Sequence, residues 1–239
     1  MGVSQPYREA WEGYWSATSD APGEAIWDAD PSLSAVPHSA LLLPYADTSL
    51  PVVDLGCGNG TQTRWLAGRF AGALGVDLSH AAIAHARRAD PEGVAAYEQL
   101  DLADGDAVRA LAGRIGDTNV YMRAVIHQSD PEARPAVAAA VATLLGTRGR
   151  AFVAELTPAS KAVLQQAAQG PQGPPPKLRR VFEHGLKPAG ATDEEVPEVL
   201  RAAGLATLDS GDTVLPQTER LPDGTRIDLP ARWFVLAPG

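Results

Sequence analysis

Cysteine is almost missing from this sequence, which has one cysteine, Cys57, among 239 residues. A lone cysteine cannot form an internal disulfide, which excludes a disulfide scaffold and fits a reducing compartment. No apolar run approaches the roughly 20 residues that a membrane-spanning helix needs. The first residues also lack the basic stretch and apolar core of a signal peptide. We therefore expect a cytoplasmic protein with no membrane partner.

Basic residues are also scarce, since 20 Lys and Arg stand against 29 Asp and Glu, a net charge of -9. An acidic surface repels phosphate backbones, and no basic run extends beyond pairs such as Arg87–Arg88. These features predict that the chain has no nucleic-acid partner. Hydrophobic residues make up 45% and charged residues 21%, which is the balance of a globular chain with a buried core.

The first 50 residues are rich in aromatic side chains, with three of the five tryptophans and three of the five tyrosines. Aromatic residues at helical spacing predict a short helix over 6–16, followed by a loop over 20–37 and a second short helix over 38–45. We interpret residues 1–50 as an N-terminal helical cap. Two roles are given equal weight. The cap is either a lid in which Tyr14 and Trp15 line a substrate pocket, or a helix that stabilises the edge of the sheet.

From residue 51 short apolar runs alternate with helical segments, which predicts parallel strands with helices on both faces. Two later apolar runs around Gly224 predict an antiparallel C-terminal hairpin. The expected fold is a doubly wound, mostly parallel seven-stranded α/β sheet over residues 51–239, with a loop or lid insertion over 157–191. The expected strands are 51–55, 73–77, 94–99, 119–126, 150–156, 205–215 and 227–236; the expected helices are 59–69, 79–88, 106–112, 130–145 and 192–203.

A glycine-rich turn follows the first expected strand, in the run Val52-Val53-Asp54-Leu55-Gly56-Cys57-Gly58-Asn59-Gly60. Glycines allow a sharp turn and a close approach of the backbone to a ligand. The spacing is G-x-G-x-G and differs from the G-x-G-x-x-G of dinucleotide-binding proteins. The carboxylate of Asp54, two residues before the first glycine, would repel a pyrophosphate. We expect the turn to bind a ligand that carries positive charge.

Three acids, Asp54, Asp77 and Asp101, lie within two residues of the ends of three successive expected strands. Parallel strands end at one edge of the sheet, where ligands of open α/β folds bind. A carboxylate at Asp77 can accept both hydroxyls of a ribose, and one at Asp101 can accept from an exocyclic amine. The set suits a nucleoside with an amino acid tail and a positive sulfonium.

These motifs together resemble the class I S-adenosylmethionine-dependent methyltransferases. The run VVDLGCGNG is similar to their first motif, GVDLS (75–79) to their second and LDL (100–102) to their third; residues 121–128 and 150–155 resemble their fourth and fifth strands. Asn119 stands where many members have an acid. The resemblance implies S-adenosyl-L-methionine as cofactor and S-adenosyl-L-homocysteine as product. It also implies these cofactor-binding residues: Asp54, Gly56, Cys57, Gly58, Asn59, Asp77, Leu78, Asp101, Leu102, Arg123 and Ala124.

A hydroxyl acceptor of high pKa needs a base, and histidine is the usual one. His127, near the end of the fourth strand, is the first candidate for the catalytic base and for substrate contact, and His38 is the second. Each has a structural alternative as a packed histidine. His80 and His85 are expected on the surface. The thiol of Cys57 has no predicted base beside it, and no metal-ligand spacing is found, so we expect neither a cysteine nucleophile nor a metal.

The sequence therefore predicts an enzyme that methylates an O or N atom of a small molecule, such as a natural product or metabolite. The alternatives are a non-methylating reaction of the bound cofactor, such as a cyclisation, and a non-catalytic cofactor-binding module. A nicotinamide-dependent dehydrogenase is disfavoured by the glycine spacing. The acceptor atom and the pathway stay open, and so does a homodimer.

Overall fold

The fold was analysed in a computed structural model that describes residues 2–170, 173–186 and 190–239. These residues form a seven-stranded sheet in the order β3-β2-β1-β4-β5-β7-β6. The first five strands run parallel, while β7 pairs antiparallel with both β5 and β6. The α/β fold predicted from the sequence is therefore confirmed. Within the described residues no helix has both the length and the apolar character to cross a bilayer.

The strand order reverses between β1 and β4, because the chain first builds outward from β1 to β3 and then returns to β4 on the other side. Ligands of open α/β sheets bind beyond the carboxyl ends of the strands at this reversal. The strands are β1 Val52–Leu55, β2 Ala73–Asp77, β3 Ala96–Gln99, β4 Asn119–Arg123, β5 Ala151–Leu156, β6 Leu205–Arg220 and β7 Arg226–Pro238.

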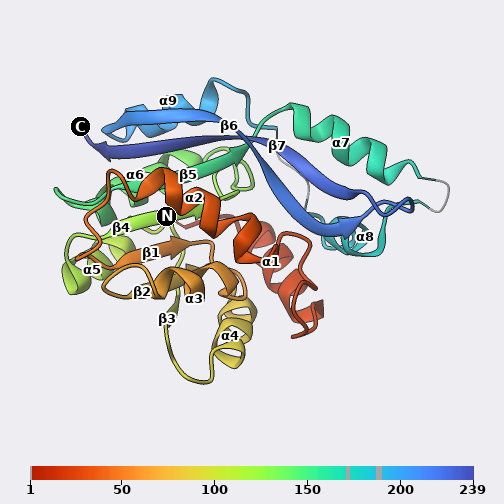
Figure 1. Cartoon of the computed structure of the whole chain (residues 1–239), viewed down its shortest axis with the longest axis horizontal. Helices are drawn as coiled ribbons and strands as arrows, with labels where there is room; N and C mark the ends of the chain where they lie inside the picture. The colour runs from red at the N-terminus through yellow and green to blue at the C-terminus, as the bar shows by residue number, and fades with distance from the viewer. Residues whose placement is uncertain (1, 171–172, 187–189) are drawn as a thin grey trace.

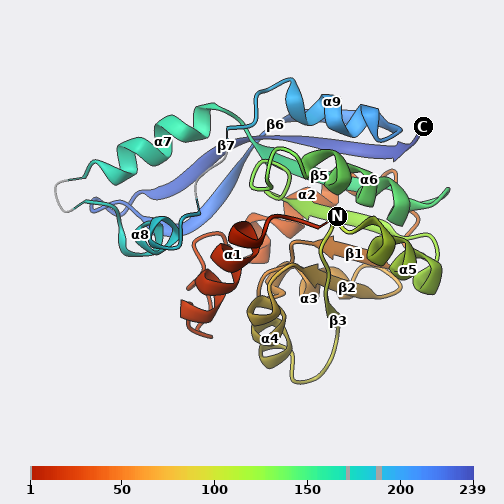
Figure 2. The same ribbon diagram turned by 180° about the vertical axis from the view of Figure 1, so that it is seen from behind.

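Helices cover both faces of the sheet: α2 and α3 lie in front in Figure 1, and α5 and α6 in front in Figure 2. One apolar core joins α5, α6 and α9 to the sheet, and a second joins α2 and α3 to the other face. The helices are α1 Gln5–Ala17, α2 Ala35–Leu42, α3 Thr61–Ala67, α4 His80–Ala89, α5 Gly105–Ile115, α6 Arg134–Leu145, α7 Ala159–Ala168, α8 Pro176–Glu183 and α9 Glu195–Ala202, with a 3-10 turn η1 at Pro31–Leu33.

The cap has more regular structure than the sequence predicted. Residues 20–37 were expected as loop, yet they contain η1 and the start of α2, which begins three residues before the expected 38. Residues 157–191 contain α7 and α8, so the described part of this insertion is mainly helical. Residues 171–172 of its proline- and glycine-rich stretch lie outside the described residues. Helix α8 begins at Pro176 itself, because proline fits the first turn of a helix, where no N–H is needed.

The β6–β7 hairpin extends past the sheet to α7 and α8 (Figures 1 and 2). A third apolar core forms at this end from α1, α7, α8 and the start of β7, with Tyr14, Trp15, Leu178, Ile227 and Leu229 among its buried members. The two sequence segments with the least recognisable pattern, 1–50 and 157–191, therefore pack on each other and on the hairpin. Apolar burial between them holds the cap together.

The fourth strand ends earlier than predicted, at Arg123 instead of residue 126. Ala124 adopts a left-handed backbone with φ 61, which stops the strand. The next helix also begins late, at Arg134 instead of 130. Oδ2 of Asp130, before this helix, accepts from the backbone N of Ser4 at 3.1 Å. The chain between β4 and α6 is thus a turn that faces the N-terminal segment.

His85 is buried, so its predicted place on the surface was wrong. Its Nε2 lies 2.9 Å from the carbonyl oxygen of Trp15, and its Nδ1 faces the carboxylate of Asp20. On the same helix α1, Glu12 accepts from the hydroxyl of Ser79 at 2.7 Å, at the start of α4. These contacts fix α1 against α4, and the burial of His85 is a consequence of that docking.

Candidate functional site

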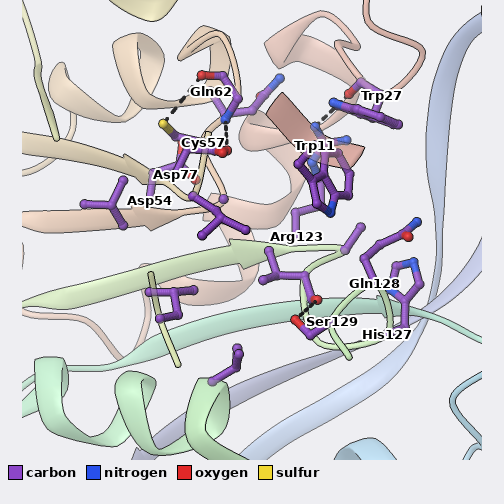
Figure 3. A pocket seen from close by; sticks show the side chains of 18 of the residues that line it. Trp11, Trp27, Asp54, Cys57, Gln62, Asp77, Arg123, His127, Gln128 and Ser129 are labelled. Atoms are coloured by element: carbon purple, nitrogen blue, oxygen red, sulfur yellow. Dashed lines mark hydrogen bonds between the residues drawn. The ribbon is translucent and has the colours of Figure 1, made fainter. Parts of the chain in front are cut away.

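A cavity opens at the carboxyl ends of the parallel strands, between the glycine turn and the cap. Its volume, with the open mouth included, is about 1270 Å³. Figure 3 shows Asp54, Cys57 and Asp77 on one side, and His127 and Gln128 on the other. Every residue assigned to cofactor binding from the sequence lines this cavity: Asp54, Gly56, Cys57, Gly58, Asn59, Asp77, Leu78, Asp101, Leu102, Arg123 and Ala124.

Asp77 ties the glycine turn to the end of β2. Its Oδ2 accepts from the backbone N of Gly58 at 2.9 Å, and its Oδ1 accepts from the N of Ser79 at 2.9 Å. Each carboxylate oxygen can accept more than one hydrogen bond, so capacity remains for a ligand diol. Burial raises the pKa of Asp77 to about 6. The carboxylate is therefore ionised at neutral pH and ready to accept from hydroxyl groups.

Asp54 lies buried beneath the turn and accepts from the hydroxyl of Thr63 at 2.6 Å. Burial raises its pKa to about 6 as well, while the positive charge of Arg123 acts in the opposite direction. Arg123, from the end of β4, donates from Nη2 to the carbonyl oxygen of Trp27 at 2.8 Å. Charges of both signs thus meet at this end of the cavity, which suits a zwitterionic amino acid group.

Gly58 has φ 55, a left-handed conformation, and Trp15 packs directly over it. A Cβ at this position would lie 2.7 Å from Cζ2 of Trp15. We expect Gly58→Ala to lower the free energy of unfolding by about 2 to 4 kcal/mol, from backbone strain and crowding together. Urea denaturation of the purified protein measures this change.

Gly113→Ala is the matched control for that substitution. Gly113 lies exposed within α5, and a Cβ there would meet nothing within 4 Å. Because alanine favours a helix over glycine, this variant should gain about 0.5 to 1 kcal/mol. Equal effects of the two substitutions would show that Trp15 does not restrict the glycine turn.

Asp101 faces the N-terminal segment. Its Oδ2 accepts from Nη2 of Arg8 at 2.8 Å and from the backbone N of Val3 at 3.0 Å, and its Oδ1 accepts from the N of Ala103 at 2.9 Å. The side chain lies in the cavity wall, as expected, and also fastens the start of the chain over the end of β3. Helix α1 therefore spans the cavity mouth.

His127 lies in the turn after β4 and is 1% exposed. Its Nδ1 donates to Oε2 of Glu155 at 2.6 Å, which makes Nε2 the acceptor nitrogen of the neutral ring. Nε2 is buried and has no hydrogen-bond partner within the described part of the chain. The side chain lines the cavity, so an unpaired basic nitrogen lies at its wall.

Glu155, near the end of β5, is the residue that the sequence did not single out. Besides the imidazole, its carboxylate accepts from the backbone N of Val125, Ile126 and His127, at 3.0, 2.8 and 3.1 Å. These contacts shape the turn that ends β4 early and place His127 in the cavity wall. The only sequence signal was an acid near the end of the otherwise apolar strand Ala151–Leu156.

Two predicted side chains lie outside the cavity lining. His38 is buried in α2, with its Nδ1 2.8 Å from the hydroxyl of Tyr121 and its ring stacked on Phe152. Burial lowers the pKa of His38 to about 3, so the ring is neutral. Tyr14 is fully buried in the cap core, where its hydroxyl accepts from the N of Ile26 at 3.3 Å. Trp15 does line the cavity.

Another part of the cavity wall comes from the cap, the end of β5 and the hairpin. These residues are Tyr7, Trp11, Trp27 and Asp28 from the N-terminal segment, and Leu156, Leu215, Gln217 and Leu229 from the far strands. Sequence reasoning missed them because no motif marks them. In the described ranges no group of three or more His, Cys, Asp or Glu could hold a metal ion.

Comparisons with known proteins match this geometry. A family model described as a methyltransferase domain matches residues 52–149, the segment that carries the glycine turn and the three acids. No curated protein matched the chain.

Solved structures resemble the chain over almost its full length. A SAM-dependent methyltransferase from Anabaena variabilis is 27% identical with a TM-score of 0.90, covering 100% of this chain and 98% of that one. A geranyl diphosphate C-methyltransferase from Streptomyces coelicolor, in complex with Mg²⁺, geranyl diphosphate and S-adenosyl-L-homocysteine, is 15% identical with a TM-score of 0.63, covering 99% of each chain. A structure concerned with conversion of a disulfide bond into a thioacetal group during echinomycin biosynthesis is 20% identical with a TM-score of 0.69, covering 97% and 92%. The similarity to the last two structures, which are 15% and 20% identical to this chain, shows a shared fold alone.

Proposed function

Because the chain is a class I S-adenosylmethionine-dependent methyltransferase, we propose that it methylates an oxygen or nitrogen atom of a small, largely apolar acceptor, with His127 as the base. The observation that carries this proposal is the unpaired Nε2 of His127 at the cavity wall, with Nδ1 held by Glu155. Apolar side chains of the cap and hairpin form the wall on the acceptor side. The acceptor is a small molecule because the cavity is enclosed between cap and sheet.

The residues at the strand ends fit the cofactor. Asp77 would accept from the ribose hydroxyls, and Asp101 with the backbone of Leu102 would meet the adenine edge. Asp54 and Arg123 lie at the end that suits the methionine group. When bound, S-adenosylmethionine supplies an activated methyl group. The protein contributes position and water exclusion, which together are worth roughly 7 to 11 kcal/mol in well-aligned reactions.

His127 accepts the proton that a hydroxyl or protonated amine acceptor must lose. Glu155 fixes the ring so that Nε2 is the free acceptor, and the negative charge of Glu155 stabilises the imidazolium that forms. General-base catalysis of this kind is worth about 10² to 10⁴ in rate. The cap, residues 1–50, acts together with the described part of 157–191 as a lid that keeps water from the acceptor.

Product mass tests the proposal. The purified protein is incubated with S-adenosylmethionine carrying a labelled methyl group and with neutral hydroxyl and amine acceptors, and with geranyl diphosphate plus Mg²⁺ as the carbon-acceptor comparison. Label transfer to a hydroxyl or amine supports the proposal. A cyclised product without added mass, or cofactor binding without turnover across the panel, would favour the alternatives. Among the described residues, Arg123 is the only Lys or Arg in the cavity lining, which disfavours a diphosphate acceptor.

Cofactor affinity should depend on pH with a midpoint near 6. The pKa values of Asp54 and Asp77 are both raised by burial to about 6 from the ordinary 3.8, and the cofactor needs both groups ionised. Protonation below pH 6 removes acceptors for the ribose and the negative charge near the cation. Affinity for S-adenosylhomocysteine should therefore be full above pH 6 and fall about tenfold per pH unit below it for each proton bound.

The stability of the free protein should depend on pH in the opposite direction to cofactor affinity. Because these pKa values are higher in the folded than in the unfolded state, the folded protein binds more protons between pH 4 and 6, and the contribution of these two acids to stability falls as pH rises through that range.

Calorimetric titration with S-adenosylhomocysteine from pH 5 to 8 measures the pH dependence of cofactor affinity. An affinity that stays constant down to pH 5 would contradict the requirement for ionised carboxylates.

A further inference from the structure

The loop that carries Trp27 and Asp28 is fastened to the methyltransferase core at three points. Arg123 donates to the carbonyl oxygen of Trp27 at 2.8 Å, Asn59 donates from Nδ2 to Oδ2 of Asp28 at 2.7 Å, and Gln62 donates to the carbonyl oxygen of Ala29 at 2.7 Å. All three donors line the cavity. A segment outside the family match is thereby held against the glycine turn.

The carboxylate of Asp28 is only half satisfied. Its Oδ2 accepts two hydrogen bonds, from Asn59 and from the backbone N of Gly23 at 2.9 Å. Its Oδ1 is buried and has no partner in the described ranges, although Asp28 is 8% exposed and lines the cavity. None of the ion pairs among the described residues includes Asp28.

A buried carboxylate oxygen without a donor is costly, and native proteins rarely leave one unpaired. Asp28 therefore requires a donor, and the cavity is the place from which a ligand could supply one. A positively charged donor fits best, since it offsets the buried negative charge as well as forming the hydrogen bond.

The position of Asp28 indicates which part of the cofactor this donor belongs to. Asp28 is bonded to Asn59 in the glycine turn, and Asp54 and Arg123 lie at the same end of the site. A methionine group has one positive and one negative substituent. The guanidinium of Arg123 matches the carboxylate, and the ammonium then needs an acidic partner with a free oxygen.

We propose that Asp28 binds the ammonium group of the methionine part of S-adenosylmethionine, through its unpaired Oδ1. The inference rests on the proposed function, because it takes the cofactor to lie with its methionine end at the glycine turn. It assigns a cofactor contact to the cap, outside residues 52–149. The product keeps the ammonium group, so Asp28 holds substrate and product forms of the cofactor alike.

Asp28→Asn tests this contact without removing the structural one. The asparagine keeps an oxygen for Asn59 and for the N of Gly23, and places a neutral NH₂ group where the unpaired oxygen lies. Calorimetry measures affinity for S-adenosylhomocysteine and for 5′-methylthioadenosine, which has the nucleoside and sulfur but no amino acid group. We expect the variant to lose about 10- to 100-fold in affinity for the first, the range for a hydrogen bond to a charged group, and less than about 3-fold for the second.

Asp30→Asn is the matched control, because it makes the same charge change two residues away. Asp30 is exposed and caps η1 by accepting from the N of Ser32 at 2.9 Å, a role that asparagine also fills. This variant should bind both ligands as the wild type does.

Three other outcomes would overturn the proposal. Equal losses for both ligands in Asp28→Asn would show that Asp28 acts only by holding Asn59, and unchanged affinity for S-adenosylhomocysteine would remove Asp28 from the site. If the wild type bound neither ligand, the cofactor assignment would fail and this contact with it. If it bound both but methylated no acceptor, the proposed reaction would fail while the Asp28 contact could still be measured.

Discussion

Asp77→Ala is expected to weaken binding of S-adenosylhomocysteine by about 100- to 1000-fold. Two ribose hydroxyls would lose a charged acceptor, and each such hydrogen bond is worth about 1.5 to 3 kcal/mol. The substitution also frees the backbone N of Gly58 and Ser79, so the glycine turn would lose the link that shapes it. Isothermal titration calorimetry at pH 7.5 measures the loss of affinity.

Asp90→Ala separates cofactor binding from folding in that experiment. Asp90 is also a buried acid that holds a turn, accepting from the backbone N of Val94 and Ala95 at 3.0 Å each, but it does not line the cavity. Both variants should therefore lower the midpoint of urea unfolding. Only Asp77→Ala should lose cofactor affinity; comparable losses in both would place Asp77 among residues that merely support the fold.

The second large effect is expected on turnover. His127→Asn should slow methyl transfer by about 10² to 10⁴-fold, since the base is removed. The amide N of asparagine can replace Nδ1 as the donor to Glu155, so the turn after β4 should persist. Affinity for S-adenosylhomocysteine should stay within about 3-fold, because cofactor recognition depends on other side chains. Single-turnover assays at saturating cofactor measure the chemical step.

The rate of the chemical step distinguishes a base from a packed histidine, because removal of a base slows methyl transfer while cofactor affinity persists. A variant with full activity would return His127 to a structural role. Glu155→Gln is a poorer test, because the same carboxylate also accepts from three backbone N–H groups and its loss would disturb the turn itself.

Local sequence signals predicted that three acids would lie together at one edge of the sheet. Asp54, Asp77 and Asp101 were each predicted from a position near the end of one strand. Parallel strands bring these ends to one edge of the sheet, independently of the rest of the chain. Those three acids all line the same cavity. The sheet was predictable for the same reason, since strand and helix periodicity are properties of short windows of sequence.

Several other features were not predictable, because their contacts join residues that are distant in the sequence. Glu155 binds backbone N–H groups of a turn that lies 28 or more positions earlier in the chain. His85 contacts the carbonyl oxygen of Trp15, which is 70 positions away. Asp28 lies in a stretch without periodicity, and only the approach of Asn59 brings it to the cavity. Such pairings depend on tertiary docking, which no single window of sequence encodes.

The β6–β7 hairpin places two apolar side chains of the cavity wall opposite each other on neighbouring strands. Leu215 and Leu229 are direct cross-strand partners, and both side chains line the acceptor cavity. Their backbones are secured by the ladder of the hairpin, which does not depend on side-chain identity. Exchanges between larger and smaller apolar residues at this pair would enlarge or narrow the acceptor space while the glycine turn stays in place.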